Sequence, residues 1–132
     1  MSDSIELVQS GYAAFAEGDI PKVLELLSVR VSWDVTSVLP EGGSWRGRDG
    51  VAEFFEQLGS LWADLTLDTE EWVDDGQNVV VVGRGAGRLR AQDNAAAGYE
   101  FVHLFTVSEG EISRFHAWAD PDEELREHMS RG

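Results

Sequence analysis

The sequence predicts an α+β fold, in which helices come first along the chain and long antiparallel strands follow. Apolar residues recur at helical spacing near the start of the chain, as Ile5, Val8, Tyr12 and Phe15 do. In the second half, apolar and polar residues alternate, which is the period of a strand with one buried face. Grouped helices followed by grouped strands are typical of α+β proteins. No linker or repeat divides the 132 residues, so we expect a single domain over 1–132.

Turn and cap residues mark the first elements. The helix predicted over 4–17 ends at Gly18. Asp19 is a typical N-cap for a second helix, which has Pro21 in its first turn. The alternating stretch 29–38 then predicts the first strand.

Glycine and proline dominate the next segment. Residues 40–50 read PEGGSWRGRDG and predict a loop, at the end of which Asp49 caps a third helix. Alternating segments follow, and they predict strands over 65–73, 78–91, 99–107 and 111–118. After them Pro121 opens a short acidic helix with Asp120 as its cap.

The motif GRGAGR, residues 83–88, looks like a phosphate-binding loop. It does not match G-x-G-x-x-G, and it continues into a strand pattern rather than a helix. Gly83, Gly85 and Gly87 fall on one face of that strand. We therefore expect a bulge, a sharp bend or the close approach of another element, and no phosphate site.

Composition excludes several functional classes. The chain has no cysteine, so it forms no disulfide and has no thiolate chemistry. Ten basic and 25 acidic residues give a net charge of −15, which disfavours binding to nucleic acid or anionic membranes. No apolar run approaches the roughly 18 residues of a membrane helix, and we expect no signal peptide. We expect a soluble, cytoplasmic protein, and the lysine-poor, alanine- and arginine-rich composition favours a bacterial source.

One predicted strand places a histidine among its buried residues. In GYEFVHLFTV, residues 98–107, His103 shares a face with Tyr99, Phe101 and Phe105. Burial disfavours the charged imidazole, so we expect a neutral ring with one donor and one acceptor. Such a ring can polarise a carbonyl group or accept a proton. The alternative is a core histidine bonded to a backbone carbonyl or an ordered water.

Four segments give the chain a family resemblance. YAAFAEGD, VLELLSVRVSWD, WRGRDGVAEFF and EGEISRFHAWADP resemble the SnoaL-like branch of the NTF2-like superfamily, to which ketosteroid isomerases and polyketide cyclases also belong. The resemblance covers nearly the whole chain. It implies an NTF2-like cone, a strongly curved antiparallel sheet wrapped around N-terminal helices and enclosing an apolar pocket. It also implies a homodimer that forms through the outer face of the sheet.

The resemblance supplies candidate catalytic positions. It places His103 at an oxyanion-donor position of the isomerases and Val35 at the position of their carboxylate base. Tyr12 lies one step from the position of their tyrosine, which is occupied here by a glycine. Phe115 and Ala117 fall where the cyclases carry their histidine and aspartate. The acid–base residues of both relatives are thus mostly replaced, and His103 is the candidate that remains in register.

Asp34 and Tyr12 are predicted to assist His103, and each has a structural alternative. Asp34 is adjacent to Val35, so it needs a bulge or a shift of register to turn inward. Otherwise it is an outer carboxylate paired with an arginine. Tyr12 fills the core between helix and sheet, either with its hydroxyl toward the pocket or as a packing residue alone.

The predicted pocket is apolar and partly aromatic, which favours a flat, apolar small-molecule ligand. Its expected lining comes from the first strand, the third helix and the last strands: Trp33, Val35, Phe54, Leu58, Trp62, Phe101, Phe105, Phe115 and Ala117.

The final strand has a second face that carries Arg114, His116 and Trp118. An arginine and a tryptophan on the outer face of a sheet suit a protein interface, so we predict that these residues form dimer contacts. The histidines and carboxylates show no ligand spacing such as H-x-H, so we expect no metal and no cofactor.

Two functions are compatible with this pattern. The first is a SnoaL-like enzyme that performs proton transfer in an isomerisation, cyclisation or dehydration of an apolar carbonyl compound, such as a polyketide or terpenoid. The second is a non-catalytic ligand-binding or dimerisation module of the same fold. An inward-facing Asp34 favours the enzyme, and a cavity filled by Trp33, Trp62 and Phe115 favours the module.

Overall fold

The computed structural model describes residues 3–130, and its elements confirm the α+β class. The helices are α1 (Asp3–Ala16), α2 (Ile20–Glu25), α3 (Gly47–Leu61) and α4 (Glu123–Ser130), with a 3₁₀ turn at Arg90–Gln92. The strands are β1 (Leu27–Val35), β2 (Gly43–Arg46), β3 (Trp62–Asp74), β4 (Asn78–Leu89), β5 (Ala95–Ser108) and β6 (Glu111–Pro121).

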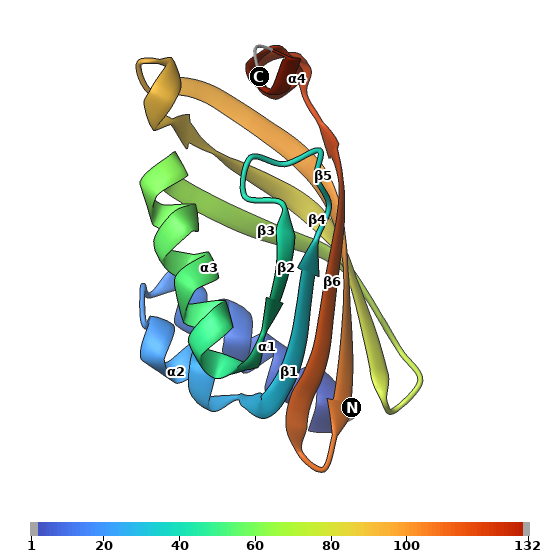
Figure 1. The fold of residues 1–132 in the computed structure, drawn as a ribbon. Coiled ribbons are helices and arrows are strands. Elements are labelled where there is room, and N and C mark those ends of the chain that lie inside the picture. The colour runs from blue at the N-terminus through green and yellow to red at the C-terminus, as the bar shows by residue number, and fades with distance from the viewer. Residues whose placement is uncertain (1–2, 131–132) are drawn as a thin grey trace.

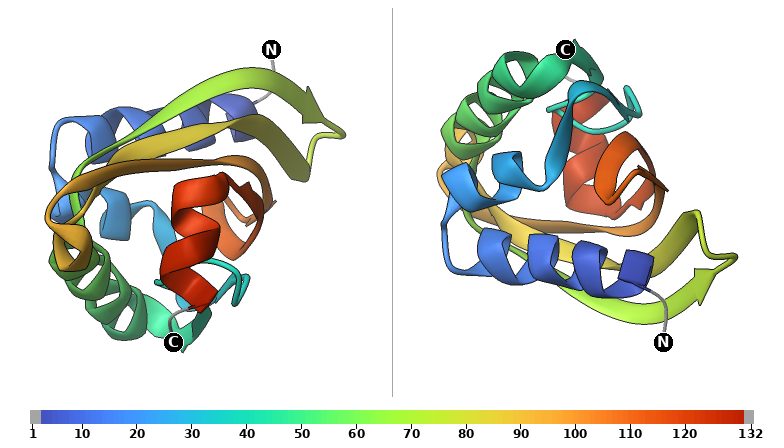
Figure 2. Two further views of the ribbon diagram at one scale, coloured as in Figure 1. Left: turned by 90° about the horizontal axis from the view of Figure 1, so that it is seen from above. Right: turned by 90° about the horizontal axis from the view of Figure 1, so that it is seen from below.

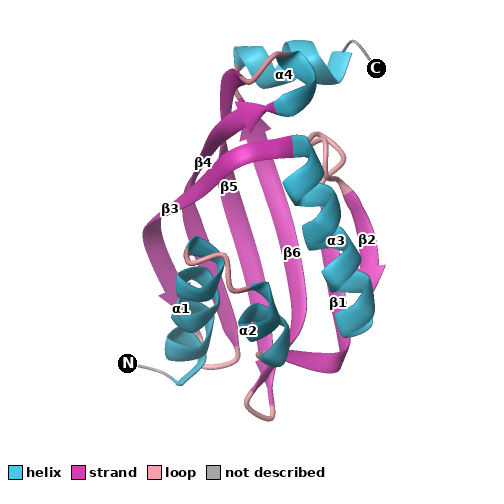
Figure 3. Cartoon of the chain, turned by 90° about the vertical axis from the view of Figure 1, so that its left-hand side faces the viewer, coloured by secondary structure: helices cyan, strands magenta, loops and turns pink. Residues whose placement is uncertain are grey.

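The strands form one open, curved sheet in the order β2-β1-β6-β5-β4-β3 (Figure 1). Helices α1, α2 and α3 lie over one face of it (Figure 3), and the core fills the space between. Helix α4 lies at one end of the molecule (Figure 2), where its Leu125 is fully buried. Any internal site must therefore lie between the inner face of the sheet and the three helices that cover it.

The sheet is curved and mostly antiparallel, as expected, and it is mixed because one pair of neighbouring strands is parallel. β1 pairs with β6 in parallel, whereas the other neighbouring strands pair in antiparallel fashion. A parallel pair needs a long crossover connection, and the chain between β1 and β6 supplies one that contains α3 and the β3–β5 meander. Alternation within a strand reports which face is buried, but it carries no information on the direction of a neighbouring strand.

The predicted junction between the first two helices is confirmed. Gly18 has φ +74°, a left-handed conformation that glycine adopts without strain. Asp19 is the N-cap of α2, since its side chain accepts a hydrogen bond of 3.2 Å from the backbone N–H of Lys22. Pro21 lies in the first turn, where a missing N–H costs nothing.

Two cap predictions and one loop prediction are wrong. The predicted loop over 40–50 contains β2 and the first turn of α3, so Asp49 lies inside the helix and does not cap it. β2 has four residues, too few to show a period. At the other end β6 continues to Pro121, and Asp122 rather than Asp120 caps α4 by accepting a bond of 2.9 Å from the N–H of Leu125.

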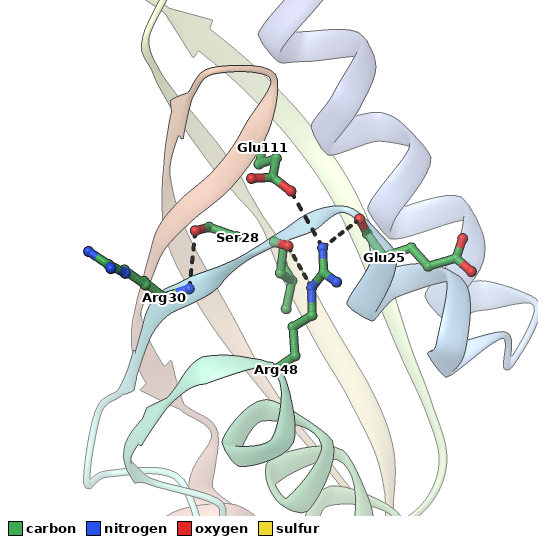
Figure 4. Close-up of polar contacts among 6 residues, drawn as sticks. Glu25, Ser28, Arg30, Arg48 and Glu111 are labelled. Atoms are coloured by element: carbon green, nitrogen blue, oxygen red, sulfur yellow. Dashed lines mark hydrogen bonds and ion pairs between the residues drawn. The ribbon is translucent and has the colours of Figure 1, made fainter.

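Arg48 ties the start of α3 to the ends of three other elements (Figure 4). Its Nε donates to the carbonyl oxygen of Leu27 at 2.9 Å, and its Nη2 reaches the carbonyl oxygen of Glu25 at 3.5 Å. The same Nη2 lies 3.4 Å from the carboxylate of Glu111 at the beginning of β6. The guanidinium therefore fixes α3 against the lower ends of β1 and β6.

Close approach explains the glycines of β4, as predicted. A Cβ on Gly83 would overlap the carbonyl oxygen of Asp68 and the ring of Phe101, and one on Gly85 would overlap the ring of Tyr99. The register of β3 against β4 also shifts next to these positions, between Thr69 and Glu71 and again between Ala63 and Thr66. The glycines and the shifts together let the sheet bend over its own aromatic face.

We predict that Gly83→Ala destabilises the protein by about 1–3 kcal/mol, because backbone and ring must move to admit the methyl group. Urea unfolding measures this difference. Gly59→Ala on α3 is the matched control, since no heavy atom lies within 4 Å of its added Cβ. That variant should be neutral or more stable by up to roughly 1 kcal/mol. Equal stability of Gly83→Ala and the wild type would contradict this account of the bend.

Candidate functional site

A cavity of about 90 Å³ lies between the inner sheet face and helices α1–α3. Apolar side chains form nearly all of its wall, and the lining residues that carry a polar side-chain group are Tyr12, Trp33, Glu41, Tyr99 and His103. This volume is smaller than the roughly 150 Å³ of an apolar cavity that accommodates benzene, so even a single ring enters only if wall side chains shift. A larger ligand requires larger movements of the wall.

Most of the predicted lining residues line this cavity: Trp33, Val35, Phe54, Leu58, Phe105, Phe115 and Ala117. Trp62 and Phe101 are buried but are not part of its wall, which corrects their predicted position. Both lie one layer behind it. The ring of Phe101 stacks on the His103 ring at 3.9 Å, and the indole N–H of Trp62 bonds to Glu41.

Tyr12 and His103 meet in the cavity wall. The hydroxyl of Tyr12 on α1 lies 2.5 Å from Nδ1 of His103 on β5. The two rings are nearly parallel, and Phe105 packs edge-on against both. His103 is 7% exposed, so this hydrogen bond is formed inside the core. It joins the N-terminal helix to the centre of the sheet.

Burial sets the protonation of this pair. It lowers the pKa of His103 from 6.5 to about 3, and it raises the pKa of Tyr12 well above 10. At neutral pH the tyrosine therefore keeps its proton and the imidazole is uncharged. We assign the tautomer in which the Tyr12 hydroxyl donates to Nδ1 and the imidazole carries its proton on Nε2. Nε2 has no hydrogen-bond partner among residues 3–130. The pair thus presents one uncommitted N–H donor.

Asp34 lies outside the cavity, which corrects its predicted role as an assistant of His103. Its carboxylate accepts a bond of 2.6 Å from the hydroxyl of Ser44 and lies 3.3 Å from Arg46 on β2. The hydrogen bond from Ser44, followed by the charge of Arg46, lowers the pKa of Asp34. β1 has no bulge here, so Val35 and Trp33 face inward and the aspartate faces the other side.

Glu41 is a site residue that the sequence analysis missed. It is 2% exposed, lines the cavity, and accepts a hydrogen bond of 3.0 Å from Nε1 of Trp62. Burial raises the pKa of the Glu41 carboxyl, although the bond from Trp62 partly opposes this. A glutamate in a segment rich in glycine and proline indicates a solvent-exposed loop, and no periodicity was present to suggest otherwise.

Arg114, His116 and Trp118 lie on the opposite face of β6 from the cavity residues. The rings of His116 and Trp118 stack with centroids 4.0 Å apart, and Trp118 is 46% exposed. A dimer through this face stays a prediction.

Two further observations concern the described residues alone. Residues 3–130 contain no group of three or more His, Asp or Glu side chains placed to hold a metal ion. In the same range, no helix combines the length and the apolar content needed to cross a membrane.

The sequence matches the family model of the SnoaL-like domain over residues 8–115. Since this match spans most of the chain, the protein belongs to the SnoaL-like domain family. No curated protein sequence matches it significantly.

Solved structures show the same architecture. An NTF2-like protein of unknown function from Burkholderia pseudomallei is 26% identical, with a TM-score of 0.86 over 98% of this chain and 97% of that one. TerC, crystallised with polyporic acid, is 25% identical, with a TM-score of 0.81 over 99% and 100%. A proposed polyketide cyclase from Xanthomonas campestris is 23% identical, with a TM-score of 0.78 over 97% and 95%. The fold is therefore NTF2-like.

The neutral state of His103 predicts a particular loss of stability in acid. Its pKa is about 3 in the folded chain and 6.5 in the unfolded one, so its contribution is complete above pH 6.5 and is lost as the pH falls toward 3. We expect the wild type to lose about 1.4 kcal/mol per pH unit in this window relative to His103→Gln. Urea unfolding at several pH values measures the difference. Tyr12→Phe keeps the imidazole and should keep the slope, whereas parallel curves for wild type and His103→Gln would contradict burial of a neutral ring.

Proposed function

We propose that this SnoaL-like protein is a small-molecule enzyme that performs proton transfer on an apolar carbonyl compound, such as a polyketide or terpenoid. Isomerisation, cyclisation and dehydration all belong to this chemistry. The proposal rests on one observation, the uncommitted Nε2–H of neutral His103 in an otherwise apolar cavity.

The donor acts on the substrate oxygen. His103 Nε2–H donates a hydrogen bond to the carbonyl, and this bond strengthens as an adjacent proton leaves and negative charge builds up on the oxygen. The hydroxyl of Tyr12 holds the imidazole in the required tautomer and orientation. A neutral donor in a buried, mostly apolar site stabilises this charge better than it would in solution, because the surrounding dielectric is low.

The departing proton needs an acceptor. Asp34 is excluded from this role by its place on the outer face. Glu41 is the carboxyl that lines the same cavity, and burial raises its pKa, so it binds a proton more readily than an exposed glutamate. His103 thus acts on the carbonyl oxygen, and Glu41 exchanges a proton with the part of the substrate that lies toward the other end of the cavity.

The relatives support a small organic ligand. TerC, which shares 25% of its residues with this chain, was crystallised with polyporic acid. The Xanthomonas relative is described as a proposed polyketide cyclase. At 23% sequence identity, its similarity to this chain is evidence for the fold alone.

A ligand-binding module without catalysis is the second candidate. The ring of Trp33 stacks on Phe115 with centroids 4.1 Å apart and also packs against Phe54, so aromatic side chains occupy much of the interior. This packing keeps the cavity small. A module of this kind binds its ligand but does not change it.

Exchange of hydrogen for deuterium separates the two functions. Apolar ketones of the steroid, terpenoid and aromatic polyketide classes are incubated with the protein in D₂O, and deuterium next to the carbonyl is followed by mass spectrometry. We expect exchange above background in the wild type and a loss of about 10²–10³-fold in His103→Leu, the effect of removing one oxyanion donor. His128→Leu on α4, away from the cavity wall, is the control.

Ligand binding in the same samples completes the test. Ketones that raise the melting temperature of the wild type without exchanging deuterium would assign the protein to the module. Exchange that survives unchanged in His103→Leu would remove His103 from the mechanism.

A further inference from the structure

A tightly turned loop carries Glu41 into the cavity. The loop joins β1 to β2 at the end of the molecule where α4 lies (Figure 1). The N–H of Leu39 donates to the carbonyl of Thr36, and the N–H of Gly42 donates to the carbonyl of Leu39. A Cβ on Gly42 would overlap the carbonyl oxygen of Thr36, so the turn requires glycine. Leu39 and Glu41 are both buried as a result.

The Glu41 carboxyl has unused hydrogen-bonding capacity. Nε1 of Trp62 donates to one oxygen at 3.0 Å, and the backbone N–H of Glu41 itself adds a local bond. No cationic side chain among residues 3–130 pairs with it. A carboxyl offers about four acceptor positions, so at least one remains for a ligand in the cavity.

The fold uses only part of this carboxyl. One oxygen accepts a hydrogen bond from the buried indole N–H of Trp62, which would otherwise lack a partner. A buried carboxyl without a cationic partner opposes folding when ionised, and burial accordingly raises its pKa. A glutamine would accept the same bond with no charge to bury, so a carboxyl that lines a cavity is better explained by what it binds there.

Glu41 and His103 lie toward different ends of the cavity. The charge of Glu41 contributes to a raised pKa of Tyr99, and the Tyr99 ring packs against that of Trp62, so these three residues lie together. Tyr99 and His103 share one face of β5 but are four residues apart, or ~13 Å along the strand. Apolar residues such as Leu58 and Phe105 complete the wall.

We propose that Glu41 and His103 bind the two ends of one ligand, and that this ligand is a ring-sized hydroxy-ketone. Its carbonyl oxygen accepts the Nε2–H of His103, and its hydroxyl group bonds to the carboxyl of Glu41. The proposal builds on the proposed function by naming the substrate class of the same cavity. It also assigns Glu41 as the residue that selects for the hydroxyl group.

Size and protonation state favour this class. The cavity of about 90 Å³ is smaller than one that holds benzene, so a single ring is the largest body that modest shifts of the wall side chains would admit. A hydroxyl group can donate to a carboxylate and can accept from a carboxylic acid, so it matches Glu41 in either state. A cationic ligand requires the ionised carboxylate, which burial disfavours.

Calorimetric titration with four single-ring probes tests the proposal. The probes are 4-hydroxyacetophenone, acetophenone, phenol and benzylamine. We expect the wild type to bind 4-hydroxyacetophenone about tenfold more tightly than acetophenone, the value of one added hydrogen bond. Glu41→Met, which removes both oxygens at similar volume, should abolish this preference and leave acetophenone binding unchanged. Glu41→Gln keeps an acceptor and should retain most of the preference.

Glu100→Gln is the matched control. Glu100 neighbours Tyr99 on β5 but is exposed and paired with Arg84, so neutralising it should change no affinity. A urea unfolding curve for each variant establishes that it is folded. Glu41→Met removes a buried carboxyl but leaves the indole N–H of Trp62 without its acceptor, so we expect a modest loss of stability, whereas Glu41→Gln keeps an acceptor for Trp62 and should keep the stability of the wild type.

The outcomes separate this inference from the proposed function. If His103→Leu weakens both ketones while Glu41→Met changes neither, the inference fails and the role of His103 stands. If Glu41→Met removes the hydroxyl preference but no ketone exchanges deuterium, the inference stands and the catalytic function fails. Tighter binding of benzylamine than of 4-hydroxyacetophenone would overturn the proposed class, as would no binding of any probe at millimolar concentration.

Discussion

The hydrogen bond between Tyr12 and His103 is the interaction on which this site depends. It connects α1 to the middle of β5, and in the assigned tautomer it leaves the imidazole proton on Nε2. It forms because the bent sheet presents the inner face of β5 to the N-terminal helix, and the glycines of β4 allow that bend. The same curvature creates the cavity that the uncommitted nitrogen of His103 faces.

The proposed function depends on the small number of polar groups in a mostly apolar interior. Most of the cavity wall is apolar. Each polar group in it is therefore costly to bury, and any hydrogen bond that it forms with a ligand is stronger than in water. His103 responds by staying neutral, and the pKa of Glu41 rises. The proposed substrate, with two polar ends and an apolar body between them, matches these two groups.

The sequence predicted those features that repeat along the chain. Alternation on β5 placed His103 inside, and helical spacing located α1 and α3. Local capping chemistry predicted Asp19 correctly, but not the start of α4, where β6 runs on for longer than its pattern indicated. The parallel pairing of β1 with β6 lay beyond prediction, because alternation does not depend on the neighbouring strand. Glu41 was missed because a loop has no hydrophobic period. Its burial depends on the backbone hydrogen bonds of the turn, which residue spacing does not reveal.

The central claim is that His103 is a neutral imidazole with its proton on Nε2. A measurement of its charge state and tautomer tests this claim most directly. Nitrogen-15 NMR of imidazole-labelled protein distinguishes a protonated ring nitrogen from an unprotonated one. The account predicts an unprotonated Nδ1 that accepts from Tyr12 and a protonated Nε2, unchanged from pH 7 down to about pH 5 because the pKa is lowered to about 3. Protonation of both nitrogens near pH 6, or a proton on Nδ1 at neutral pH, would contradict it. In either case Nε2 could not serve as the neutral donor on which the proposed chemistry rests.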